Sequence, residues 1–385
     1  MKIKAYYPNY FVDAGIAGAA YHLLKGMQSP TSQVRLMGLG SVDIFNDDFY
    51  KNTIPACLDS IIYKVLPYQA ILNVSEEIYK STLKKNDIAY LWPGVTLATY
   101  QRLKSRGCKI IYEGVNTHEV HSKTILDKAY TQLNLPSTHN VTAEKVILES
   151  AKLEIADFVY SCSPIMTESM LNNGIPQHKI LQTSYGLSVQ SIIDGVYTKA
   201  PVQNKQLTFI FVGSISVRKG IHLLLDYWAK AKLNARLQLV GQIEDAIKPF
   251  VEQYLGRFNI EHVPYTNDLA SVYKNADAFV LPSLEEGSPL VTYMAFGAGL
   301  PLLVSPMGGG GVVTHGEDAI VIDPYDSEAW IAQLKNLSVD PELRARLAQQ
   351  SKLKAPYYLW DAVAKRRLNS LTEAMNQNEN ISIRW

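Results

Sequence analysis

Short hydrophobic runs recur along the whole chain, and most of them end at Gly, Pro or a small polar residue. In the first half these runs are 2–8, 34–40, 87–93, 109–114, 157–163 and 179–186. In the second half they are 207–214, 235–242, 260–265, 278–283, 300–306 and 319–324. Helical patterns such as 96–107 and 143–156 separate them. Strands that alternate with helices form βαβ units, so the pattern predicts an α/β fold with parallel sheets.

The alternation lapses once, between residues 187 and 206. We therefore expect two α/β domains with a cleft between them, an N-terminal domain at 1–190 and a C-terminal domain at 205–356. Helical patterns close the chain, and the last of them lies within 357–385.

Composition narrows the class of protein. The 385 residues are 47% hydrophobic and 19% charged, as in a globular protein, and the net charge of +1 gives no argument for nucleic-acid binding. Three widely spaced cysteines, Cys57, Cys108 and Cys162, suggest neither a disulfide framework nor a metal motif. Because the first residues also lack the apolar core of a signal peptide, we expect a cytoplasmic protein. Residues 288–315 carry no Asp, Glu, Lys or Arg, but their glycines and prolines favour a buried core over a membrane span.

Two loops carry candidate chemistry. Arg218 and Lys219 lie between the strand pattern 207–214 and the helix that follows Gly220, where two cations suit a diphosphate, although a solvated loop would look the same. Glu285 and Glu286 follow the strand pattern 278–283. One of the two acids could cap the next helix, and a second could accept hydrogen bonds from sugar hydroxyls.

Three segments together resemble family 4 glycosyltransferases of the GT-B fold: 212–220 (VGSISVRKG), 276–293 (ADAFVLPSLEEGSPLVTY) and 297–306 (GAGLPLLVSP). These are retaining enzymes that use nucleotide-sugar donors. The resemblance implies two Rossmann-like domains facing a cleft, a donor held mainly by the second, and a C-terminal helix that crosses back to the first. It implies neither a metal nor a cofactor.

The resemblance also assigns residues. Arg218 and Lys219 match the cations that hold the donor diphosphate, and Ser214 stands where many members have arginine. Glu286 matches the first acid of the E-x7-E signature and lies against the donor sugar, which makes Glu285 the expected cap. The second acid, which normally holds the ribose, is replaced by Met294. The donor loop matches Gly287, Ser288, Pro289 and Leu290.

In the first domain, Gly15 and Gly18 match the family's glycine loop, although tight helix–strand packing would need the same residues. His118 resembles a histidine on the acceptor side that could take part in proton transfer, or it could make a structural hydrogen bond. Glu113 and Asn116 are weaker acceptor-side candidates.

The predicted function is transfer of a sugar, with retention, from a nucleotide-diphosphate donor to a hydroxyl of a glycan or lipid-linked acceptor in cell-surface polysaccharide synthesis. Met294 motivates the alternative of a non-catalytic GT-B paralogue that binds glycan or a partner transferase. A same-fold epimerase or phosphorylase is a third reading, but no lysine motif argues for pyridoxal. Basic runs at 104–109 and 365–367 could touch the inner membrane face peripherally, but a solvated helix face is favoured for them.

Overall fold

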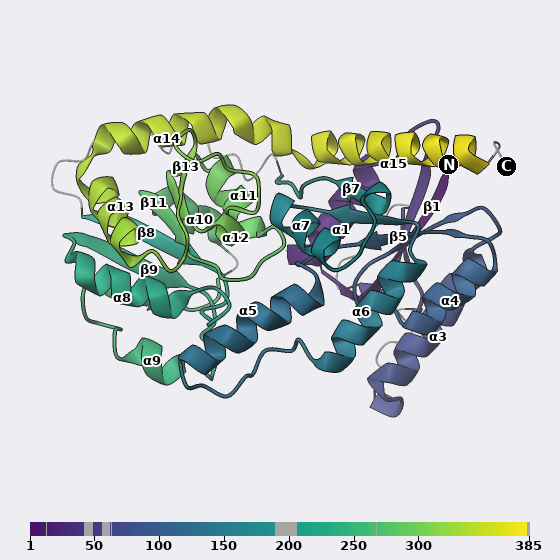
Figure 1. Cartoon of the computed structure of the whole chain (residues 1–385), viewed down its shortest axis with the longest axis horizontal. Coiled ribbons are helices and arrows are strands. Elements are labelled where there is room, and N and C mark those ends of the chain that lie inside the picture. Colours follow the sequence, from purple (N-terminus) through teal and green to yellow (C-terminus); the bar gives the residue numbers. More distant parts are fainter. Residues whose placement is uncertain are drawn as a thin grey trace.

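The computed structural model describes residues 1–12, 14–41, 49–55, 62, 64–188, 206–266 and 268–382. It contains two parallel sheets flanked by helices, which form two lobes side by side (Figure 1). The expected α/β class is therefore confirmed. The change from one sheet to the other falls between residues 182 and 207, and most of the predicted linker, together with Cys57, lies outside the described residues.

The N-terminal domain is built on a seven-stranded sheet of order β3-β2-β1-β4-β5-β6-β7. Its strands are β1 (Lys2–Phe11), β2 (Gln33–Ser41), β3 (Tyr50–Asn52), β4 (Ile88–Leu91), β5 (Lys109–Glu113), β6 (Phe158–Ser161) and β7 (Ile180–Gln182). Its helices are α1 (Gly15–Gly26), α3 (Tyr68–Thr82), α4 (Leu97–Ser105), α5 (Glu119–Gln132), α6 (Ala143–Ile155), α7 (Pro164–Asn172) and the 3₁₀ turn η1 (Gln177–Lys179).

The C-terminal domain has a six-stranded sheet of order β10-β9-β8-β11-β12-β13. Its strands are β8 (Leu207–Val212), β9 (Ala235–Val240), β10 (Ile260–Val263), β11 (Ala278–Leu281), β12 (Leu302–Val304) and β13 (Ala319–Val321). Its helices are α8 (Ile221–Ala231), α9 (Lys248–Glu252), α10 (Leu269–Asn275), α11 (Leu290–Gly297), α12 (Pro306–Gly309), α13 (Ser327–Val339), α14 (Pro341–Lys354) and the 3₁₀ turn η3 (Ala355–Tyr358).

Both sheets change strand order at their first strand. β1 lies between β2 and β4, and β8 lies between β9 and β11. The chain therefore builds each sheet first on one side of this strand and then on the other side. Such a point leaves a crevice at the carboxyl ends of the strands, where ligands bind in open α/β sheets. Gly15, the first residue of α1, follows β1, and Arg218 lies in the loop after β8.

The start of α8 is fixed by a close approach to β11. Gly220 adopts φ +69°, and a Cβ built on it would lie 2.1 Å from the carbonyl oxygen of Pro282. A side chain at this position would therefore meet both backbone strain and a clash. The contact holds the Arg218–Lys219 loop against the loop that follows β11.

The final helix, α15 (Trp360–Ser382), crosses back to the N-terminal domain, as the resemblance implied (Figure 1). It packs so closely on α1 that a Cβ on Gly26 would lie 2.7 Å from the Cβ of Ala364. Where it begins, Leu187 and the segment after η3 run side by side, since the Leu187 N–H donates to Tyr358 O (2.9 Å) and the Trp360 N–H donates to Leu187 O (3.1 Å). The two connections between the domains are thus joined to each other.

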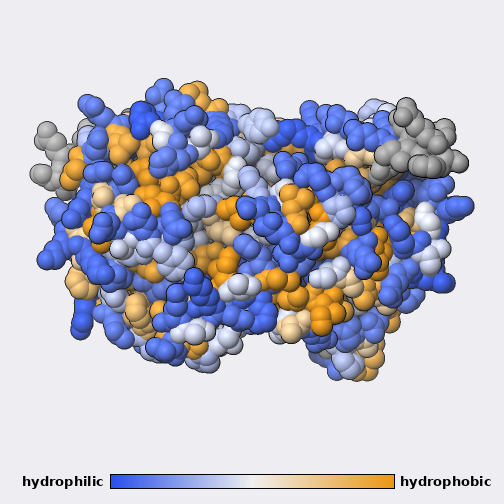
Figure 2. Space-filling model, in the orientation of Figure 1, coloured by the Kyte–Doolittle hydropathy of each residue, from blue (hydrophilic) through white to orange (hydrophobic). Residues whose placement is uncertain are grey.

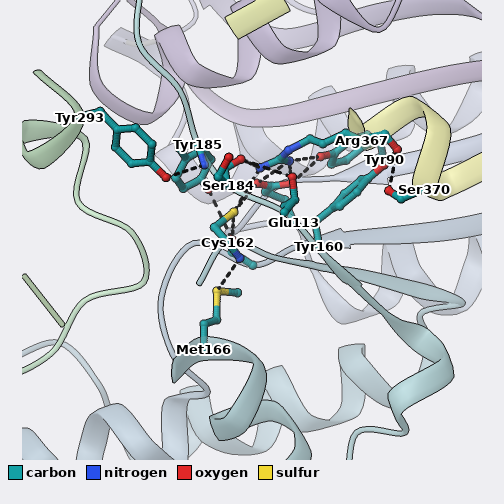
Figure 3. Close-up of polar contacts among 12 residues, drawn as sticks. Tyr90, Glu113, Tyr160, Cys162, Met166, Ser184, Tyr185, Tyr293, Arg367 and Ser370 are labelled. Carbon is teal, nitrogen blue, oxygen red and sulfur yellow. Dashed lines mark hydrogen bonds and ion pairs between the residues drawn. The ribbon is translucent and has the colours of Figure 1, made fainter. Parts of the chain in front are cut away.

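The basic run on α15 is not simply a solvated face. Lys365 is exposed, but Arg367 is completely buried and pairs with Glu113 at the end of β5 (Figure 3). The interpretation of this run as a solvated helix face is therefore wrong at Arg367. The helical periodicity and the charges of the run do not reveal that a buried carboxylate faces the helix.

Hydrophilic side chains cover most of the face shown in Figure 2, and hydrophobic ones form smaller patches between them. Within the described residues, no helix combines the length and the apolar character needed to cross a bilayer.

Candidate functional site

A cavity of about 410 Å³ opens between the carboxyl ends of the two sheets. The C-terminal domain contributes Ser214, Arg218, Lys219 and Glu285, and the N-terminal domain contributes residues of the β5–α5 loop and of α5. Three of the residues predicted for the donor side, Ser214, Arg218 and Lys219, therefore lie together at the cleft. We call this space the cleft cavity.

Arg218, Lys219, Glu285 and Glu286 form a cluster of four charges beside this cavity. Arg218 Nε lies 2.7 Å from Glu285 Oε2, Arg218 Nη2 lies 3.4 Å from Glu286 Oε2, and Lys219 Nζ contacts Glu286 Oε1. Burial opposes ionisation of Glu286, but Lys219 and Arg218 outweigh it and lower the pKa of this carboxyl. Glu286 is therefore ionised at neutral pH, and both cations already have a carboxylate partner.

Glu285 joins the two domains. Its Oε1 accepts hydrogen bonds from Thr117 Oγ1 (2.9 Å) and Ser122 Oγ (3.0 Å) of the N-terminal domain. The side chain is buried, and α11 begins at Leu290, after the N-cap Pro289, with no side-chain cap. The expectation that Glu285 caps this helix is wrong. Local sequence could not reveal its role, because its hydroxyl partners lie more than 160 residues earlier in the chain.

The loop after Glu286 touches the N-terminal domain directly. A Cβ built on Gly287 would lie 1.9 Å from Val115 O, so only glycine fits here without movement of the domains. Ser288 Oγ lies 2.8 Å from Tyr293 Oη and donates to Gly310 O at 3.2 Å. Pro289 is the N-cap of α11 and Leu290 its first residue.

Met294 lies on α11, half-buried and packed against the hydrophobic core. The glycines of the first domain lie at the start of α1, where Gly15 adopts φ +55° and a built Cβ would meet no neighbour within 4 Å. Gly18 is buried within the same helix. Gly15 is thus required by its left-handed backbone, whereas Gly18 fits the interpretation of close packing.

A smaller cavity of about 230 Å³ lies at the carboxyl ends of β1, β4 and β5. It shares Asn116 and Glu119 with the cleft cavity, so the two spaces adjoin. We call it the β1–β5 cavity. Its described lining is Tyr7, Asn9, Ile16, Pro93, Tyr112, Val115, Asn116, Thr117, Glu119 and Glu149.

The acceptor-side candidates separate in the structure. Asn116 is in the cleft, where its Oδ1 accepts from Arg218 Nη2 at 3.0 Å. Glu113 is instead engaged by Arg367 beneath α15 (Figure 3). Glu119 and Glu149 line the β1–β5 cavity, and the sequence analysis did not predict either of them. The one local signal was that Glu119 directly follows the candidate His118.

His118 is the N-cap of α5 and is almost completely buried. Its Nδ1 accepts from the Val120 N–H at 3.2 Å, so the proton of the neutral ring is on Nε2, which has no hydrogen-bond partner among the described residues. Burial lowers the pKa of His118 to about 4, which keeps the ring neutral at pH 7. The predicted structural hydrogen bond is therefore present, and the Nε2–H group is buried.

Among the described residues, no three His, Cys, Asp or Glu side chains gather closely enough to hold a metal ion.

Comparison with known proteins relates the second domain to a sequence family and the whole chain to a known fold. Residues 198–354 match the family model of glycosyl transferases group 1. An uncharacterised glycosyltransferase of Haemophilus influenzae is 29% identical over 166 residues, which are 41% of this chain and 46% of that protein. The chain spans less than half the length of the curated relatives that it matches here.

Two solved structures align over nearly the whole chain. Sucrose-phosphate synthase from Thermosynechococcus elongatus has a TM-score of 0.68 at 16% identity, covering 99% of both chains. The Anabaena protein HepE in complex with UDP and glucose has a TM-score of 0.66 at 14% identity, covering 97% of this chain and 100% of that one. The two-domain architecture is thus that of the GT-B glycosyltransferases, which confirms the expected fold.

Proposed function

We propose that this protein is a retaining glycosyltransferase that moves a sugar from a nucleotide-diphosphate donor to a hydroxyl of a glycan or lipid-linked acceptor, in cell-surface polysaccharide synthesis. The observation that carries the proposal is the position of Arg218, Lys219 and Glu286 at the cleft, within the segment that matches group 1 glycosyl transferases. The structural neighbour HepE was solved with UDP and glucose, which supports a nucleotide-sugar donor.

The chemistry of the cluster fits this transfer. Arg218 and Lys219 would neutralise the charge that builds on the departing diphosphate, which is the largest electrostatic demand of the reaction. Glu286 would accept hydrogen bonds from the donor sugar, and an acceptor hydroxyl would enter from the N-terminal domain near His118. The acceptor oxygen would bond to the anomeric carbon on the face that the phosphate leaves, and the departing phosphate would take its proton. No metal or other cofactor is part of this proposal.

Incubation of the purified chain with UDP-, GDP- and ADP-sugars tests it, with release of nucleoside diphosphate as the readout. We expect slow donor hydrolysis with at least one sugar nucleotide, and its loss in Arg218→Ala/Lys219→Ala. Lys230→Ala is the matched control, because Lys230 is exposed on α8 of the same domain. Full activity in the double variant would contradict the phosphate assignment.

Met294 supports a second candidate, a non-catalytic GT-B protein that binds glycan or a partner transferase, because one donor contact implied by the resemblance is missing. Calorimetry with nucleoside diphosphates separates the two. Absence of binding by any of them at millimolar concentration would favour the non-catalytic protein. We place either activity in the cytoplasm, with peripheral contact to the inner membrane face.

A further inference from the structure

The β1–β5 cavity has a polar lining without basic side chains. Two carboxylates, Glu119 and Glu149, contribute to it together with Asn9, Asn116 and the hydroxyl of Tyr7, and none of its described lining residues is Lys, Arg or His. Lys145 and Arg218 attract Glu119 electrostatically, but neither lines this cavity. The space therefore offers hydrogen-bond acceptors and amides, and it offers no counter-charge for an anion.

Glu119 stands where the two cavities meet, since it lines both the β1–β5 cavity and the cleft cavity. Its Oε2 is buried without a hydrogen-bond partner among the described residues. A buried, unpartnered carboxylate oxygen costs free energy, and a ligand hydroxyl would remove that cost. Glu119 is the first residue of α5, so the helix fixes the position of its backbone.

Glu149 is held in place by the protein itself. It accepts from Tyr112 Oη (2.9 Å) and from the Glu119 N–H (2.6 Å), and it is a buried residue of the cavity lining. Because Tyr112 and Glu149 satisfy each other, Glu119 is the acid left to meet a ligand.

We propose that the β1–β5 cavity binds the receiving sugar of the acceptor as an uncharged polyol, with Glu119 accepting a hydrogen bond from the hydroxyl that is presented to the cleft. This inference rests on the proposed function, because it assigns the acceptor of the same site. A phosphorylated receiving sugar would meet two acidic side chains and no Lys, Arg or His in the described lining, and a negative charge near a carboxylate is unfavourable. The volume of about 230 Å³ lies below the usual range of ligand pockets, so one sugar unit enters and the rest of the acceptor stays outside.

Direct binding tests the inference without any need for turnover. The probes are octyl glycosides of glucose, galactose, mannose and N-acetylglucosamine, and the 6-phosphates of the same four sugars, each titrated by ligand-observed NMR. We expect at least one glycoside to bind and all four phosphates to bind at least about tenfold more weakly than it. A sugar phosphate that binds more tightly than every glycoside overturns the proposal.

Variants place the binding in this cavity. Glu119→Gln keeps the shape and removes the charge, and we expect it to weaken glycoside binding by about tenfold, which corresponds to one lost hydrogen bond to a charged group. Glu144→Gln is the matched control, because Glu144 is also an acid in the first turn of a helix, α6, but is exposed and lines neither cavity. Equal glycoside binding in Glu119→Gln and in the unmodified protein overturns the assignment of Glu119.

The donor side is measured in the same samples. Nucleoside diphosphate binding by calorimetry should not weaken in Glu119→Gln, because this variant removes a negative charge near Arg218 and leaves both donor cations in place. If glycosides bind as expected but no nucleotide does, the proposed transferase function fails and the polyol site stands. If nucleotides bind and release is stimulated only by sugar phosphates, the function stands and the polyol site fails.

Discussion

Glu285 and Glu286 are neighbours in the chain but have different partners. Glu286 faces Lys219 within its own domain, whereas Glu285 binds Arg218 and two hydroxyls of the other domain. The two carboxylates together balance the two cations. A donor diphosphate would therefore have to compete with Glu286 for Lys219, so part of the electrostatic attraction to the donor is offset before it binds.

The first prediction concerns Met294. If a donor ribose lies against α11, Met294→Glu should strengthen binding of nucleoside diphosphate, because a carboxylate can accept from ribose hydroxyls and a thioether accepts only weakly. A gain of about 1–3 kcal/mol is the usual scale, or roughly ten- to a hundredfold in affinity. Calorimetry with UDP, GDP and ADP checks this, with Met294→Leu as the control. Affinity that is equal in the two variants would mean that the ribose does not lie here.

The second prediction concerns Glu149, whose pKa burial raises to about 7. The folded protein then holds this proton more tightly than the unfolded chain, so the contribution of Glu149 to stability falls as pH rises from about 4.5 to about 7. Glu149→Gln resembles the protonated form and should be more stable than the unmodified protein by up to about 3 kcal/mol at pH 8, but equal to it near pH 4.5.

Urea unfolding of both proteins across this pH range is the measurement. His118 has a lowered pKa and the opposite sign, because its neutral form is lost as pH falls towards about 4. Because His118 Nδ1 lies 3.8 Å from Glu149 Oε2, the two titrations are coupled, and the comparison is read between pH 6 and pH 8, where the folded His118 ring is neutral in both proteins. A difference that does not change with pH would contradict the raised pKa.

At the scale of one element, α15 is held to the N-terminal domain by a buried arginine rather than by apolar contacts alone. Arg367 Nη1 donates to Glu113 Oε2 (2.8 Å) and to Tyr90 Oη (2.8 Å), and Arg367 Nη2 donates to Ser184 O (3.0 Å). Figure 3 shows these groups converging on the guanidinium from β4, β5 and the segment after β7. The backbone N–H of Tyr185, next to Ser184, donates a hydrogen bond to Tyr293 Oη of the C-terminal domain (2.9 Å). The anchor of α15 therefore lies close to a contact between the domains.

The third prediction follows from the cost of an unpaired buried charge. Arg367→Met should lower the free energy of unfolding by about 3–5 kcal/mol, because Glu113 is left without its counter-charge. Arg367→Met/Glu113→Gln should recover a large part of that loss. Lys365→Met, on the exposed face of the same helix, should change stability by less than about 0.5 kcal/mol. Urea unfolding followed by circular dichroism measures all three, and a double variant as unstable as Arg367→Met would count against the pairing.

At the scale of the whole molecule, local pattern was enough for most strands, although it missed β3, and it was insufficient for the contacts between the elements. The run 2–8 became β1 and the run 207–214 became β8, because strand and turn signals act over a few residues. The resemblance supplied the crossing of α15 and the position of Glu286 near Arg218 and Lys219. The partners of Glu285 and Arg367 were missed, because these partners lie far away along the chain and a local hydrophobic pattern carries no information about such contacts. Glu119 and Glu149 became visible as a pair only when β5, α5 and α6 were packed together.

The last prediction concerns the contact of the two domains at Gly287. A methyl group there would lie 1.9 Å from Val115 O, which is backbone and cannot rotate away, so Gly287→Ala should hold the domains apart. Separation would break the bonds from Thr117 and Ser122 to Glu285 and admit water to the cleft, and closure of such clefts assembles the two halves of a site. We expect a larger radius of gyration by small-angle scattering and at least about a tenfold loss of any donor hydrolysis.

Gly174→Ala is the matched control, because a Cβ there meets no atom within 4 Å and only its φ of +85° adds local strain. An unchanged radius with full activity in Gly287→Ala would mean that the contact is not needed for the working form of the protein.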